Sequence, residues 1–261
     1  MSVINAEAAT EATAQPSMFS LDALLSASTS LHTGEQAARA SEMQLWLTPG
    51  IRISENWKLT ALGIITQNLE NEMGVTMSDV EIGARRKGWE LNPFLKFSPG
   101  IGMKVPGSKT SVVGRGFRTS IAVKPRLMYD LSALKIWGLR AISGYYQASG
   151  TRNFHEFNTS ITGVSNSQYS FVNTLRVNVA FTEKLSLTLD QLFTAAWTYE
   201  GTPKSTFEMG QELSYEFTES FALGVGHNNS GNMYKENGLD SNLQFFNQDH
   251  STVYMSAAFK L

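Results

Sequence analysis

Residues 18–31 read MFSLDALLSASTSL, and apolar and polar side chains alternate along most of the stretch. The odd-numbered positions from Phe19 to Ala27 are all apolar, whereas most even-numbered positions are Ser or Asp. A period of two is that of a β-strand whose two faces meet unlike surroundings. Soluble strands average about 5–6 residues, and a strand that crosses a membrane needs about 9–11. The length of this stretch therefore favours a membrane strand with one face toward lipid.

The same pattern recurs along the rest of the chain. It predicts twelve strands, at residues 18–31, 40–53, 57–68, 76–87, 93–105, 116–131, 135–148, 167–182, 185–199, 204–218, 220–228 and 250–261. The predicted connections alternate between short turns, such as 54–56, 87–92 and 132–134, and longer segments, such as 32–39, 147–166 and 229–249. Short turns at one end and long loops at the other are typical of a transmembrane antiparallel β-barrel. An even number of strands places both termini at the same end.

Composition narrows the class of protein. The 261 residues show no internal linker, so we expect one barrel domain over 18–261. There is no run of eighteen apolar residues that would predict a spanning helix. A net charge of -2 argues against a nucleic-acid partner, and the absence of cysteine excludes disulfides and thiol catalysis.

The first residues contain no basic segment followed by an apolar one, so they do not form a complete export signal. We expect residues 1–17 to be a flexible N-terminal arm from which the signal has been removed. Alternatively, residues 3–7 are the tail of the signal.

Strand parity predicts an apolar outer wall with aromatic side chains near both strand ends. The expected aromatic positions are Trp57, Tyr129, Trp137, Phe181, Phe217 and Phe221 near the short turns, and Tyr145, Phe171, Trp197, Tyr199 and Phe207 near the loops. Aromatic rings favour the headgroup level of a membrane. A soluble β-sandwich with these aromatics in its core is the alternative. Pro-Gly pairs at 49–50 and 99–100 predict a bend or bulge in two strands.

In the final residues, STVYMSAAFKL at 251–261, apolar residues occupy every second position: Val253, Met255, Ala257, Phe259 and Leu261. This segment resembles the assembly signal of Gram-negative outer-membrane β-barrels, although that family usually ends on an aromatic residue. The whole of 18–261 resembles the twelve-stranded members of the class, which include small channels and a few enzymes. The resemblance implies an outer-membrane location, with short turns and both termini in the periplasm and long loops outside the cell.

Function should then depend on the inward side chains. Arg85 is one of the basic residues expected to point inward. We expect the pore to be lined by two opposed sets of charged residues. The basic set is Lys96, Lys104, Arg118, Lys124, Arg126, Arg140 and Arg176, and the acidic set is Asp22, Glu42, Asp190, Glu208 and Glu212. Asp79 and Glu81 lie on the basic side and interrupt this division. Opposed charged walls around water predict a porin-like passive channel for small hydrophilic solutes, with a weak anion preference. In the alternative, these charges pair across a narrow bore and plug a structural barrel.

The enzyme alternative is a lipid-modifying hydrolase with a His base and a Ser nucleophile. His227 with Ser230 is the best candidate pair, but residues three apart in a strand face opposite sides. We therefore predict that the protein is not an enzyme, and no pattern predicts a cofactor or a metal site. Outer-membrane lipid is an expected partner. Small residues on the outer wall, Ala61, Gly63, Ala141 and Ser143, leave room for a second copy in a homo-oligomer.

Overall fold

The fold is a closed antiparallel β-barrel in a computed structural model of the chain. The structure describes residues 18–31, 41–70, 74–134, 138–234, 240–247 and 250–261. The predicted N-terminal arm, 1–17, and the whole of the predicted first loop, 32–39, lie outside the described residues. Among the described residues, no helix has the length and hydropathy that crossing a membrane would require.

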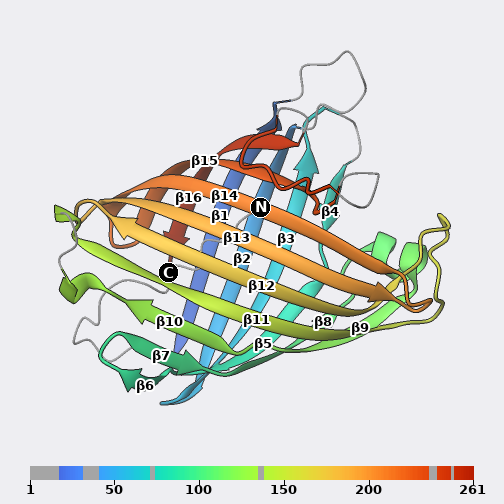
Figure 1. Cartoon of the computed structure of the whole chain (residues 1–261), viewed down its shortest axis with the longest axis horizontal. Coiled ribbons are helices and arrows are strands. Elements are labelled where there is room, and N and C mark those ends of the chain that lie inside the picture. Colours follow the sequence, from blue (N-terminus) through green and yellow to red (C-terminus); the bar gives the residue numbers. More distant parts are fainter. Residues whose placement is uncertain (1–17, 32–40, 71–73, 135–137, 235–239, 248–249) are drawn as a thin grey trace.

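In the described residues, sixteen labelled strands make up the wall (Figure 1). They are β1 (Phe19–Ser30), β2 (Ser41–Ser54), β3 (Trp57–Asn68), β4 (Val75–Met77), β5 (Val80–Arg86), β6 (Trp89–Asn92), β7 (Leu95–Ser98), β8 (Gly100–Val105), β9 (Phe117–Val123), β10 (Arg126–Asp130), β11 (Ala141–His155), β12 (Ser167–Ala180), β13 (Leu185–Thr198), β14 (Pro203–Thr218), β15 (Phe221–Asn232) and β16 (Ser251–Lys260). Two short helices, η1 (Thr110–Gly114) and η2 (Ser132–Leu134), lie in connections.

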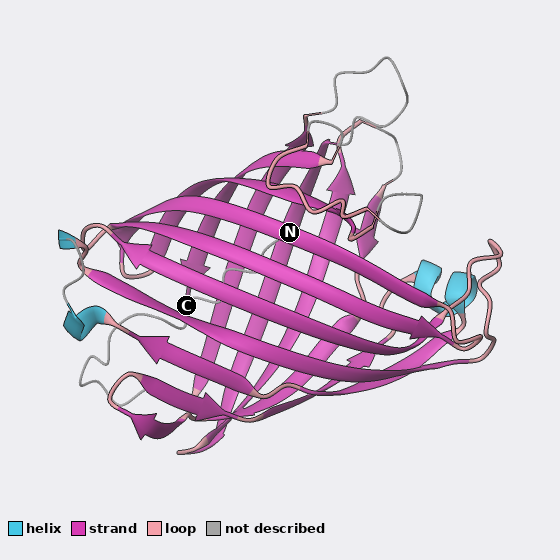
Figure 2. Ribbon diagram, viewed as in Figure 1, coloured by secondary structure: helices cyan, strands magenta, loops and turns pink. Residues whose placement is uncertain are grey.

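Local interruptions divide three long strands into labelled pieces. β4, β5 and β6 follow one path, and β7 with β8 and β9 with β10 follow two more, so the described residues form twelve barrel strands. β1 pairs with both β2 and β16, and β11 pairs with β12, so the sheet closes on itself. Figure 2 shows the resulting tilted cylinder, almost entirely strand. The predicted all-β barrel of twelve strands is confirmed.

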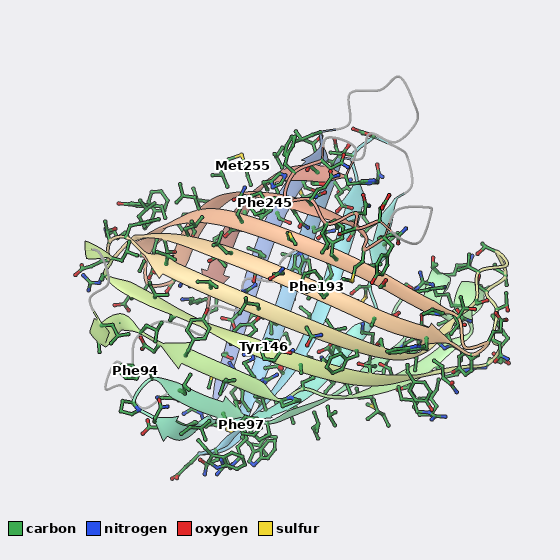
Figure 3. All side chains as sticks on the ribbon, viewed as in Figure 1. Phe94, Phe97, Tyr146, Phe193, Phe245 and Met255 are labelled. Carbon is green, nitrogen blue, oxygen red and sulfur yellow. The ribbon has the colours of Figure 1, made fainter. Side chains whose placement is uncertain are left out.

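The two faces of the wall differ as the alternation predicted. Large apolar side chains on the outer face are exposed, among them Ile101, Ile121, Val225 and Met255. Figure 3 labels further outward residues, Phe97, Tyr146 and Phe193. The buried residues are instead largely polar or charged, including Ser98, Arg126, Arg176 and Glu212. This distribution is the reverse of a soluble domain and fits a barrel with an apolar exterior and a polar lumen.

Connections at one end of the barrel are mostly short, and those at the other end are mostly longer. The turn end carries the connections 55–56, 93–94, 131–140, 181–184 and 219–220, and the loop end carries 31–40, 69–74, 106–116, 156–166, 199–202 and 233–250. Both ends of the barrel sequence meet at the turn end, where Leu21 and Leu261 exchange two main-chain hydrogen bonds of 2.9 Å.

The seventh strand corrects a prediction. It was expected at 135–148, but β11 spans Ala141–His155, and 135–137 lie outside the described residues. Helix η2 and Gly138, whose φ of 71° suits glycine, lengthen the connection before the strand starts. The predicted loop 147–166 shrinks to 156–166 for the same reason.

The two faces of the seventh strand are also the reverse of those expected. Tyr145 lines the lumen, whereas it was expected among the outer aromatic residues. Ala141 and Ser143 have the same parity as Tyr145 and therefore do not form the expected outer patch.

Smaller corrections concern strand ends and bulges. The predicted turn 87–92 contains β6, because Trp89 pairs with Phe97 and Glu90 with Lys96, and the register shifts only between Glu90 and Asn92. β15 continues to Asn232, beyond the predicted end at 228. Pro49 causes no bulge, since the β2–β3 register is the same on both sides of it and shifts only between Arg52 and Ser54.

Candidate functional site

The lumen contains a cavity of about 680 Å³. Inward side chains of strands between β2 and β14 line it, and they combine small polar groups such as Thr60, Thr151 and Thr194 with a concentrated group of charges. A cavity lined by polar and charged side chains is where a barrel can select solutes.

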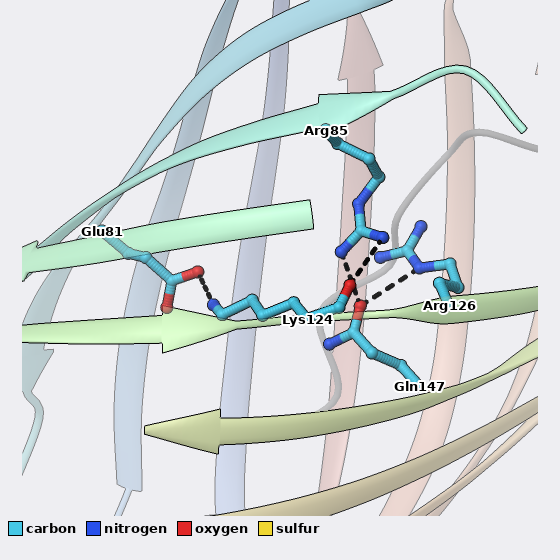
Figure 4. Close-up of polar contacts among 5 residues, drawn as sticks. All are labelled: Glu81, Arg85, Lys124, Arg126 and Gln147. Atoms are coloured by element: carbon cyan, nitrogen blue, oxygen red, sulfur yellow. Dashed lines mark hydrogen bonds and ion pairs between the residues drawn. The ribbon is translucent and has the colours of Figure 1, made fainter. Parts of the chain in front are cut away.

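Five residues form what we name the lumen cluster: Glu81, Arg85, Lys124, Arg126 and Gln147 (Figure 4). Gln147 Oε1 accepts hydrogen bonds from Arg85 Nη2 at 2.7 Å and from Arg126 Nε at 3.2 Å. Lys124 Nζ forms an ion pair with Glu81. The cluster thus contains three cations and one carboxylate, which leaves it with a positive field.

Glycines on β8 leave room for two long side chains of the lumen cluster, Arg85 and Lys124. A Cβ at Gly100 would lie 3.1 Å from the Arg85 guanidinium carbon, and one at Gly102 would lie 3.3 Å from Lys124 Cε. Lys124 can therefore reach past β8 to Glu81 on β5. Both side chains lie along the wall, and they do not project across the bore.

Two prolines interrupt the wall beside the lumen cluster. Ser98 pairs with Arg126 and Ile101 with Val123, and this constant register sets Pro99 opposite Pro125. Proline offers no N–H to the ladder. Ser98 Oγ replaces the missing donor of Pro99 by donating to the Arg86 carbonyl at 2.5 Å.

Arg85 is fixed by main-chain oxygens at this interruption. Its Nη1 donates to the carbonyl of Ser98 at 3.3 Å and to that of Lys124 at 3.2 Å. These carbonyl and amide acceptors are neutral, so their contacts orient the guanidinium without offsetting its charge. The fold therefore holds this charge in the lumen wall in one orientation.

Tyr145 on β11 forms an aromatic surface between two arginines. The guanidinium carbon of Arg126 lies 4.2 Å from the centre of the ring, and that of Arg176 lies 5.7 Å from it. Cation–π contacts of this kind contribute about 0.5–2 kcal/mol, with the larger values at desolvated sites. The contacts restrain the arginines on the wall.

Arg176 and Asp190 form a buried ion pair between neighbouring strands. They are direct partners in the β12–β13 register. Arg176 Nε donates to Asp190 Oδ1 at 2.6 Å and Nη2 to Oδ2 at 3.0 Å, and the side chains are only 9% and 13% exposed. Glu212 on β14 is also buried and accepts a hydrogen bond from Ser256 Oγ at 3.2 Å.

The predicted pore residues fall into three groups. Lys104, Lys124, Arg126, Arg176, Asp190 and Glu208 line the lumen cavity. Asp22, Glu42 and Glu212 lie on β1, β2 and β14 respectively but do not line it. Lys96, Arg118 and Arg140 are more than half exposed and pair with Glu90, Glu156 and Glu183 respectively.

Arg140 requires a correction. It precedes β11 and pairs with Glu183 in the turn 181–184 at 2.8 Å, so it lies at the turn end and not on an inward strand face. The physical reason is the later start of the seventh strand.

Sequence reasoning missed Gln147 and Tyr145 as lumen residues. Both lie on the seventh strand, whose faces were assigned in the opposite sense. The alternation of polar Ser149, Thr151 and Asn153 beyond the predicted strand end was the signal that could have found them.

The histidine of the hydrolase alternative, His227, contacts a different serine from the one expected. His227 Nε2 lies 3.0 Å from Ser251 Oγ on the outer face, and not beside Ser230. Ser251 is only 1% exposed, its Oγ accepts a hydrogen bond from the Asn247 main chain at 3.1 Å, and Phe246 stacks on His227. A nucleophile must reach a substrate carbon, so this pair serves here to fix the last loop against the wall.

No protein-family model matches the chain, and no curated protein sequence matches it. Solved structures do share its fold. An outer membrane channel from Pseudomonas putida F1 has a TM-score of 0.60 and 11% identity, with 95% of this chain and 97% of that chain covered. The NanC porin has a TM-score of 0.58 and 13% identity, with 92% and 100% covered, and a KdgM porin structure has 0.50 and 10%, with 92% and 98% covered.

These likenesses show that the chain has the twelve-stranded barrel fold of outer-membrane channels. At such low identity, solute and selectivity are not carried over from them.

Proposed function

We propose that this protein is a passive channel in the bacterial outer membrane for small water-soluble solutes, with a weak preference for anions. The observation that carries the proposal is the polar lumen cavity with the lumen cluster on its wall. The turn end with both termini would face the periplasm, and the loop end would face outward, which is the usual arrangement of such barrels. The apolar outer wall would contact lipid.

The anion preference follows from the local balance of charge. The residues that line the lumen cavity include three carboxylates, Glu81, Asp190 and Glu208, and five cations, Arg85, Lys104, Lys124, Arg126 and Arg176. A passing anion therefore meets a lining with a net positive charge, and a narrow low-dielectric lumen strengthens that field.

The plugged barrel was the competing interpretation. It requires ion pairs that cross the bore, but Arg176 and Asp190 are neighbours along the wall, and Lys124 reaches Glu81 past β8. Pairs that follow the wall leave the cavity beside them, and this favours a channel over a plug.

Swelling of liposomes that contain the purified barrel tests permeation directly. Liposomes with the protein should swell in iso-osmotic solutions of small solutes such as arabinose or glycine, and liposomes without it should not. Equal swelling rates with and without a barrel shown to be folded would refute the proposed channel.

A further inference from the structure

A second cavity, of about 740 Å³, lies at the loop end and is separate from the lumen cluster. Helix η1, the 156–166 connection and the ends of β11 and β14 surround it. We name it the loop-end pocket. It shares Lys104, Asn153 and Ser167 with the lumen cavity, so the two spaces adjoin.

The walls of the loop-end pocket are fastened to each other. Asn166 is buried, and its Nδ2 donates to the carbonyls of Arg115 and Phe157, each at 2.9 Å. The Ile161 main chain donates to Gly114 at 2.9 Å. Two loops that are cross-linked in this way form a pre-organised wall, which lowers the entropic cost of binding.

The charge of the loop-end pocket is unbalanced. Four cations line it, Lys104, Lys109, Arg115 and Lys204, and within the described part of the chain none of them makes an ion pair. Asp79 is the one carboxylate in the lining, and its two oxygens accept hydrogen bonds from Gly107 N at 3.1 Å and Ser111 Oγ at 2.7 Å.

The lining of the loop-end pocket is also partly apolar. Val113, Ile161 and Val164 contribute to it and are more than half exposed, although they belong to connections and not to the outer wall. Phe117 is buried in the same lining, next to His155 with 5.4 Å between ring centres. Small-molecule sites combine apolar surface with a few charged groups in this manner.

We propose that the loop-end pocket binds a small organic anion that carries an apolar group, such as an aryl carboxylate, before it enters the lumen. The cations would attract the carboxylate, and the valine and isoleucine side chains would cover the apolar group. Lys104, which lines both cavities, is placed to pass the anion onward. Binding in the pocket stands on its own geometry, whereas its role in uptake rests on the proposed channel function.

Benzoate is the probe, and ligand-detected NMR of the detergent-purified full chain measures its binding. Benzyl alcohol retains the ring without the charge, and acetate retains the charge without the ring. We expect benzoate to bind more tightly than both. Lys109→Gln combined with Arg115→Gln should weaken benzoate binding about five- to tenfold, which is the size expected for two partly exposed charges.

The matched control removes two cations from the turn end, with Lys87→Gln and Lys184→Gln, and should leave benzoate binding unchanged. A third variant, Val113→Ser with Ile161→Ser, should weaken benzoate but not acetate. Equal benzoate affinity in the wild type and in the Lys109/Arg115 variant would overturn the proposal, as would equal affinity for benzyl alcohol and benzoate.

Binding and conduction fail independently in this design. A barrel that binds benzoate but passes no current would contradict the channel and retain the site. A conducting barrel that binds no benzoate would contradict the site and retain the channel.

Discussion

Arg85 donates a hydrogen bond from Nη1 to the main-chain carbonyl of Lys124 at 3.2 Å, and this contact joins two lumen cations from different strands. It occurs where Pro99 and Pro125 oppose each other in the wall. Main-chain acceptors thus orient a cation in the lumen wall, and the first two predictions below depend on this arrangement.

Selectivity should depend on the lumen cluster. Lys124→Gln with Arg126→Gln removes two of its three cations, so the ion selectivity of the pore should shift toward cations, measured as a change of reversal potential in a salt gradient. Lys87→Gln with Lys184→Gln removes the same amount of charge at exposed turn-end positions and should change the reversal potential little. An unchanged reversal potential in the Lys124/Arg126 variant would exclude these two residues from selectivity.

Gly100 should be intolerant of a side chain. A Cβ there would lie 3.1 Å from both the Arg85 guanidinium and the Lys124 carbonyl. Gly100→Ala should destabilise the barrel by about 1–3 kcal/mol, as overpacking does, measured by urea unfolding in lipid vesicles. Gly83→Ala is the control, because its nearest contact would be an ordinary 3.6 Å. Equal stability of the two variants would show that β8 has spare room.

The Arg176–Asp190 pair should be important for stability because it is buried. Asp190→Asn removes the carboxylate that pairs with Arg176 and should lower the free energy of unfolding by about 3–5 kcal/mol. Replacing both residues of the pair, with Arg176→Leu and Asp190→Leu, removes both buried charges. This double variant should lower the free energy of unfolding less than Asp190→Asn does. Urea unfolding of the three proteins compares them. A double variant less stable than Asp190→Asn would contradict this account.

The His227–Ser251 pair should lack hydrolytic activity. Ser251 is covered and already hydrogen-bonded, so the wild type and Ser251→Ala should hydrolyse short p-nitrophenyl esters at the same background rate. A wild-type rate well above background that Ser251→Ala abolishes would establish the enzyme alternative.

The barrel could be predicted from sequence because alternation is read locally. In most strands, 18–31 among them, the alternation of apolar and polar residues itself indicates which side faces lipid. The same alternation of apolar and polar residues predicted the number of strands and the difference in length between turns and loops.

The seventh strand could not be placed correctly in this way. Around Tyr145 and Tyr146 an aromatic residue occupies each parity, so local alternation fits either face. The choice was made by η2 and by pairing with β10 and β12, which are tertiary effects. Arg140 was misplaced, and Gln147 and Tyr145 were missed, as a result of this one ambiguity.

The contacts of the lumen cluster also depend on non-local register. Sequence alone identified Lys124 and Arg126 as inward, but not that Pro99 opposes Pro125 or that Gly100 and Gly102 leave room for cations from other strands. These relationships exist only after the strands are paired.

The most direct test of the central claim is single-channel recording of the wild-type barrel in a planar bilayer under a salt gradient. The account predicts steady openings whose reversal potential shows a mild preference for anions. Silence from a barrel whose heat-modifiable gel mobility shows it to be folded would contradict the open lumen, and a clear cation preference would contradict the positive wall.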